Sequence, residues 1–143
     1  MSQFVTSISP MPRGYAGQLT RGFFDNTVET KVADGAVGFG VAVTLDSGKA
    51  KATSAASDDV YGISLREYGQ ADMPGDQAEK FVAVLRRGYV AVKAAGTPAA
   101  GGAVYLNSSG AITADSSSTT KVPNAVFCGA ADADGIVEIA FNI

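Results

Sequence analysis

The side chains that carry most enzyme chemistry are scarce in this sequence. It contains no histidine, which excludes a Ser-His-Asp triad, a histidine general base and a histidine metal ligand. Its single cysteine, Cys128, excludes an intramolecular disulfide and a cysteine-cluster zinc site. Cys128 follows Phe127 in an apolar stretch. A buried, inert thiol is a better interpretation there than a nucleophile, because a nucleophile needs a base nearby.

The carboxylates do not form a recognisable acid–base pair or metal site. Asp132-Ala133-Asp134-Gly135 is similar to the start of a calcium loop, but the third oxygen ligand and the distal glutamate are missing. A turn before the last strand is therefore the preferred interpretation. Asp58, Asp59 and Asp115 are predicted to be loop carboxylates, and nothing in the sequence selects two of them as a catalytic pair. The sequence predicts no catalytic residue, no metal and no cofactor.

Arg86-Arg87 is the one basic doublet in the chain. Guanidinium groups bind phosphate and carboxylate well, so the doublet could contact a phosphate or an acidic protein surface. The alternative is a solvated strand edge, where charge discourages edge-to-edge aggregation. Both arginines are candidate partner contacts.

Composition narrows the function classes further. The 143 residues suffice for one domain with a real core, and 46% of them are hydrophobic while only 17% are charged. A net charge of −3 argues against nucleic-acid binding, which normally shows a basic patch. No apolar run approaches the roughly 18 residues that a membrane span needs. Met1-Ser2-Gln3-Phe4 is not the start of a secretory signal, so we expect synthesis in the cytoplasm.

Most of the chain shows the alternation typical of β-strands. Val37–Leu45 has large residues at every second position, and Asp46-Ser47-Gly48 is typical of a tight hairpin turn before a strand at Lys49–Thr53. The same alternation continues around Ile63. Further strands are expected at Phe81–Leu85, at Tyr89–Lys93 and at Val137–Ile143, whereas Gln70–Lys80 is expected to be a loop or a single turn. We predict an all-β fold, a small single-domain barrel or sandwich of about eight short strands.

Residues 1–22 differ from the body, 23–143. Pro10 and Pro12 remove backbone donors, and several glycines follow, so we predict an extended N-terminal arm. Its apolar side chains are costly to leave in water, so they either cover the protein's own barrel or contact a partner. They are Phe4, Val5, Met11, Tyr15 and Leu19.

Two segments of the sequence resemble each other. Ala42–Gly48 is similar to Ala103–Gly110, and each segment is followed by polar residues and then by another strand. The pattern indicates a duplicated β-unit that forms two related halves of one barrel. The alternative is that two hairpins with Asx-Ser-Gly turns simply look alike.

Three stretches of the chain resemble the structural cement, or head-decoration, proteins of tailed bacteriophages. They are Ser9–Gln18, Val37–Leu45 with its turn and continuation to Ile63, and the region that contains Gly88–Val92 and Ala103–Gly110. The resemblance implies a small, non-enzymatic β-rich protein on the outer face of a virion capsid. Its implied partners are the major capsid protein and further copies of itself, with a homotrimer favoured and a homodimer as the alternative.

The runner-up function is a phage or bacterial β-sandwich module that binds a surface glycan. Such modules usually display aromatic side chains on one face, but this chain has no tryptophan and only 8% aromatic residues. An enzyme is the weakest of the three function classes because histidine is absent. We therefore expect a virion structural protein that binds capsid subunits and stabilises the head.

Overall fold

A computed structural model describes residues 14–21, 26–66, 81–117 and 119–143. Nine strands and no helix are found in these residues, which confirms the all-β prediction. The strands are β1 (Thr27–Val32), β2 (Ala42–Asp46), β3 (Lys49–Ala52), β4 (Gly62–Ser64), β5 (Phe81–Lys93), β6 (Ala103–Leu106), β7 (Ile112–Thr113), β8 (Thr120–Phe127) and β9 (Ile136–Phe141). The predicted loop at Gln70–Lys80 lies outside the described residues.

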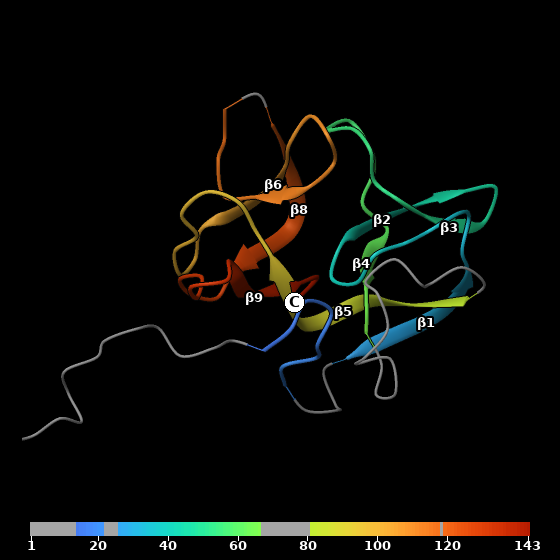
Figure 1. The fold of residues 1–143 in the computed structure, drawn as a ribbon, viewed down its shortest axis with the longest axis horizontal. Coiled ribbons are helices and arrows are strands. Elements are labelled where there is room, and N and C mark those ends of the chain that lie inside the picture. The colour runs from blue at the N-terminus through green and yellow to red at the C-terminus, as the bar shows by residue number, and fades with distance from the viewer. Residues whose placement is uncertain (1–13, 22–25, 67–80, 118) are drawn as a thin grey trace, which may run out of the picture.

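The strands form two curled halves that share β5 (Figure 1). In the first half, β2 lies between β3 and β4, and β4 pairs with the first part of β5. In the second half, β6 lies between β7 and β8, and β8 pairs with β9, which pairs with the second part of β5. The predicted internal repeat therefore corresponds to a repeated strand order.

Each half also curls back on itself in the same way. Ala33, directly after β1, forms a parallel bridge with Ala50 in β3. Ala95, shortly after β5, forms a parallel bridge with Thr113 in β7. In this arrangement β1 occupies the same place in the first half that the second part of β5 occupies in the second half.

One sequence prediction was wrong at β5. Two strands were expected around Arg86-Arg87-Gly88, but the structure has one continuous strand of 13 residues. Gly88 allows the strand to pass from one half to the other, because its φ of 144° lies where side chains are disfavoured. A Cβ on Gly88 would also lie 2.2 Å from Oδ1 of Asn26. The alternation of side chains predicts strands on both sides of Gly88 correctly. Gly88 bends the strand and does not end it in a turn.

The predicted strand at Val37–Leu45 is also shorter than expected. Residues 37–41 are not a strand, and β2 begins at Ala42. Gly40 has a φ of 68°, which ends the extended conformation, and a Cβ there would lie 2.6 Å from the backbone nitrogen of Gly17. Val37 and Phe39 are nevertheless buried, whereas Leu45 is exposed on the β2–β3 hairpin.

The core consists of two clusters that meet at β5. Val82 and Val84 point into the first-half cluster with Val37, Phe39 and Val43. Ala83 and Leu85, on the opposite face of the strand, belong to a larger cluster that reaches into the second half. The larger cluster contains Ile63, Leu65, Val90, Val92, Val104, Leu106, Phe127, Val137, Ile139 and Phe141 among others.

Candidate partner-binding surface

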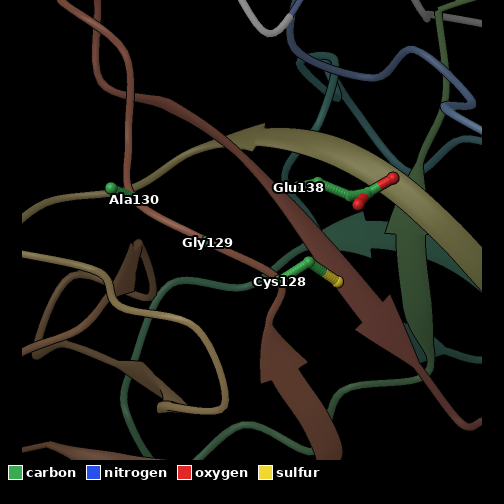
Figure 2. Close-up of a pocket in the computed structure, with 4 residues that line it drawn as sticks. All are labelled: Cys128, Gly129, Ala130 and Glu138. Atoms are coloured by element: carbon green, nitrogen blue, oxygen red, sulfur yellow. The ribbon is translucent and has the colours of Figure 1, made fainter. Parts of the chain in front are cut away.

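Cys128 lies in a small cavity of about 80 Å³ directly after β8 (Figure 2). Its side chain is half-buried and lies beside the carboxylate of Glu138 in β9. Burial raises the pKa of the Cys128 thiol, and the negative charge of Glu138 raises it further. The thiolate is therefore disfavoured at neutral pH, and this pair is not arranged for nucleophilic catalysis.

Glu138 instead anchors the described part of the predicted arm. Its carboxylate accepts hydrogen bonds from the Thr20 hydroxyl and from Nε and Nη2 of Arg21, the latter two at 3.1 and 2.8 Å. The guanidinium of Arg21 also lies 4.0 Å from the centre of the Tyr89 ring. The hydrogen bond from Arg21 lowers the pKa of Glu138, so this carboxylate is charged at neutral pH.

The backbone of residues 17–20 adds an extended segment to the free edge of β5. Gly17 N donates to Ala91 O at 2.8 Å, and Thr20 N donates to Tyr89 O at 3.2 Å. In return, Ala91 N donates to Gln18 O at 2.9 Å. This part of the predicted arm therefore lies on its own chain. Phe4, Val5 and Met11, the arm's other apolar candidates, lie outside the described residues.

Tyr15 and Leu19 remain exposed even though their backbone segment is fixed. With Val28 and Leu65 they line a shallow hollow of about 420 Å³, which Arg66 borders. Arg66 is held there by its backbone N–H, which donates to Gly17 O, and by its guanidinium, 5.2 Å from the centre of the Tyr15 ring. The hollow is thus lined by apolar side chains together with Gln18, with the cation of Arg66 at its edge.

The apolar surface continues along β1 and the start of β5. Val28 is 42% exposed, Val32 is 47% exposed and Phe81 is 65% exposed. Val32 and Phe81 are paired across the two strands, so their side chains share one face. We call the set Tyr15, Leu19, Val28, Val32 and Phe81 the apolar surface. Exposed groups of this kind mark interaction sites more often than isolated apolar residues do.

The two arginines of the basic doublet, Arg86 and Arg87, have different surroundings. The Arg86 guanidinium lies 3.6 Å from the centre of the Tyr61 ring, and its Nε is buried without a hydrogen-bond partner in the described part of the chain. Arg87 is exposed opposite Thr27 of β1. Because the Arg86 guanidinium is stacked on Tyr61 and Arg87 is exposed, a partner surface would meet the two side chains differently.

Near Arg86, Tyr61 joins a charged cluster at the mouth of the first half. The Tyr61 hydroxyl donates a hydrogen bond to Glu29, and Lys31 Nζ lies 3.8 Å from a Glu29 oxygen. The hydrogen bond from Tyr61 lowers the pKa of Glu29, and the positive charges of Lys31 and Arg86 add to the effect. Each charged group of the cluster thus has a structural contact.

Of the remaining acidic candidates, Asp58, Asp115 and Asp132 accept hydrogen bonds from nearby backbone N–H groups. Asp132 Oδ1 accepts hydrogen bonds from the backbone N–H groups of Asp134 and Ile136, which fixes the predicted turn before β9. In the ranges that the structure describes, no three His, Cys, Asp or Glu side chains are grouped as metal ligands. Nor does any helix in those ranges have the length and hydrophobicity to cross a membrane.

Comparison with known proteins decides the family. The sequence model for structural cement proteins (E217 gp24/Pam3 gp6) matches residues 4–142, which is nearly the whole chain. The chain belongs to the structural cement protein family. Its members are structural proteins of bacteriophage capsids, and this cement protein therefore has a structural, capsid-associated role.

The fold of this cement protein is shared with a chain in a solved structure entitled "The capsid of Myoviridae Phage XM1". The match has a TM-score of 0.78 and covers 99% of this chain and 98% of that chain, at 19% sequence identity. A search of curated protein sequences found no match.

Sequence reasoning missed most of the apolar surface of this cement protein. Tyr15 and Leu19 were candidates, whereas Val28, Val32 and Phe81 were not. Val28 and Val32 occupy alternate positions of a strand, which predicts a buried face as readily as an exposed one. Only the pairing of β1 with β5, together with the burial of the described residues, shows that the face of Val28 and Val32 is exposed.

Proposed function

We propose that this cement protein binds the outer surface of a phage capsid and bridges neighbouring major capsid protein subunits, so that the head resists internal pressure. Its family supports a capsid-associated role, and the apolar surface supplies a place for the contact. Full burial of one such side chain contributes about 1.5–3 kcal/mol, so a few per copy, repeated over a lattice, stabilise a shell.

The observation that carries the proposal is the exposure of Phe81 beside Val32 on a face with no catalytic group. A large aromatic ring that stays 65% exposed is unfavourable in water and is typical of a protein contact. The arm is the second element of the proposal. We assign residues 1–22 as the arm and 23–143 as the body, with Phe4, Val5 and Met11 as further contacts.

The test is co-sedimentation of the purified protein with capsids that lack it. We expect the wild-type protein to bind and to raise the temperature at which the capsids break open. Phe81→Ser should weaken binding at least tenfold, whereas Val126→Ser should not, although Val126 on β8 is also exposed. Binding to a glycan array with no binding to capsids would favour the glycan alternative and overturn the proposal.

Deletion variants test the arm separately. Removal of residues 1–13 leaves the contacts of Thr20 and Arg21 with Glu138 in place, so the body should keep its β spectrum and melting temperature. Capsid binding should decrease if Phe4, Val5 and Met11 contact a partner. Normal decoration by the shortened protein would show that residues 1–13 are a passive tail.

Location and self-association belong to the same proposal. We infer synthesis in the host cytoplasm and assembly onto the outer capsid face. Arg87, the exposed member of the doublet, is the arginine better placed for an acidic partner surface. Symmetric self-association suits a symmetric host surface, with the homotrimer favoured by resemblance and the homodimer as the alternative.

A further inference from the structure

The two halves of the molecule meet at a groove with a volume of about 330 Å³. Both halves and the predicted arm contribute to its lining, so we call it the junction groove. Among the lining residues are Ala16 of the arm, Ala42, Ala52 and Thr53 of the first half, and Gly110 and Ile112 of the second half. A protein that bridges two capsid subunits needs two separate contact surfaces, and the junction groove is distinct from the apolar surface.

Close contacts fix the walls of the junction groove. The Thr53 hydroxyl donates a hydrogen bond to Gly110 O at 2.7 Å and holds the first half against the second. On the side of the arm, a Cβ on Gly40 would lie 2.6 Å from Gly17 N, so the two backbones are in direct contact. The groove is therefore formed before any partner binds, as most binding pockets are.

Residues 15–17 of the arm separate the junction groove from the hollow of the apolar surface. Tyr15 and Gly17 line the hollow, whereas Ala16 lines the groove. The backbone of this segment is anchored, because Gly17 bonds to Ala91 of β5 and to Arg66. The two concave surfaces thus lie on different sides of one fixed segment, which suits contact with two different subunits.

The chemistry of the lining indicates what the junction groove can bind. Thr53 and Ser109 are the hydroxyl-bearing residues among the described residues that line it. Both hydroxyls are already used inside the molecule, that of Thr53 on Gly110 O and that of Ser109 on Oδ1 of Asn107. A polar ligand such as a glycan needs several polar groups to orient it, so an apolar group fits this groove better.

Lys93 supplies the charge of the junction groove. Its side chain is exposed, and its ammonium forms no ion pair within the described part of the chain. No aspartate or glutamate is found among the described residues that line the groove. The complement of this surface is therefore an apolar side chain with a carboxylate beside it, because a cation at the rim favours an anionic group there.

We propose that the junction groove is a second capsid-contact site, which takes an apolar side chain of a major capsid protein subunit while Lys93 binds an adjacent aspartate or glutamate of that subunit. This inference rests on the proposed function, since it assigns the occupant to the capsid. The apolar surface contacts one subunit and the junction groove contacts its neighbour. One copy of the protein bridges the two subunits in this way.

Capsids that lack the cement protein provide the test, with binding and stabilisation measured separately. Ala111 is exposed at the groove, so Ala111→Phe should fill it without unfolding the protein, and Lys93→Glu reverses its charge. Each variant should bind at least tenfold more weakly but still co-sediment through the apolar surface. At saturating concentration, neither should raise the temperature at which the capsids break open, because one of the two contacts is missing.

Matched controls separate the groove from general effects of the same substitutions. Ala100→Phe and Lys121→Glu make identical changes at exposed positions outside the groove, so both should bind and stabilise capsids like the wild type. Lys93→Arg keeps the positive charge and should also stabilise them. Circular dichroism establishes that each variant is folded, and Lys93→Glu carries the test if Ala111→Phe does not fold.

The outcomes distinguish this inference from the proposed function. Full stabilisation of capsids by both Lys93→Glu and Ala111→Phe would overturn the groove assignment and leave capsid binding intact. Failure of the wild-type protein to bind capsids would instead refute the proposed function. Sedimentation without capsids tests the other occupant, a second copy of this chain. An oligomer that Ala111→Phe or Lys93→Glu converts to the 14.5 kDa monomer would show that the groove serves self-association, and would also overturn the proposal.

Discussion

The hydroxyl of Thr53 donates a 2.7 Å hydrogen bond to the carbonyl oxygen of Gly110 and so links the two halves of the molecule directly. Thr53 follows β3 in the first half, and Gly110 lies in the β6–β7 turn of the second half. The contact is buried and tight, since a Cβ on Gly110 would lie 2.4 Å from the backbone of Thr53. The halves are therefore joined at this turn as well as through β5.

Gly110 and Gly48 provide a matched pair of variants. Both have a φ of 80° in corresponding hairpin turns, but a Cβ on Gly48 would meet nothing within 4 Å. Gly48→Ala should cost about 1–2 kcal/mol from backbone strain alone. Gly110→Ala should cost about 1–3 kcal/mol more, because the Thr53 backbone must move. Urea denaturation measures both costs, and equal losses would show that the halves are not tightly packed there.

Substitution of Phe39 and of Phe81 compares the stability contribution of a core residue with that of a residue on the apolar surface. Phe39 is 8% exposed within the first-half cluster, so Phe39→Ala should destabilise the protein by about 3–5 kcal/mol. Phe81 is largely exposed, so Phe81→Ala should change stability by no more than about 0.5 kcal/mol. Thermal denaturation in the absence of capsids is the measurement. A large loss for Phe81→Ala would mean that this ring belongs to the core.

The thiol of Cys128 should react slowly with alkylating reagents. Because burial and Glu138 raise its pKa, alkylation by iodoacetamide at neutral pH should be slower than that of a free cysteine, and its pH profile should be displaced upward. Glu138→Gln should move the profile back part of the way, since burial remains. Alkylation faster than that of free cysteine at pH 7 would contradict this account.

The sequence predicted the fold class better than it predicted the surface. The alternation at Ile63 and at Val137, Ile139 and Phe141 reflects burial on one face of a strand, and these four residues are buried as expected. The extended run at Val37–Val41 was wrong because alternation records which side chains are buried and not the backbone angle at Gly40. The apolar surface depends on which strands pair, and long-range pairing leaves no local pattern in the residues of β1.

The anchor of residues 14–21 on β9 should depend on pH. The Arg21 hydrogen bond lowers the pKa of Glu138 in the folded protein, so the charged carboxylate favours the folded state. This contribution is fully present above the unfolded-state pKa, which is near the ordinary value of 4.5, and is lost as pH falls through the lower folded-state value. Glu138→Gln should therefore lower the melting temperature at neutral pH, and the difference from wild type should shrink below pH 4.5.

Two further variants show whether the effect belongs to the anchor. Arg21→Gln should lower the melting temperature in the same direction and with the same loss of effect in acid, because it removes the other half of the pair. Asp46→Asn removes one negative charge from the exposed end of β2 and controls for net charge. In both anchor variants, the amides of Gly17 and Thr20 should exchange faster with solvent, since their bonds to β5 depend on a segment that is no longer held. A melting-temperature difference that stays constant from neutral pH into acid would show that Glu138 acts through packing and not through its charge.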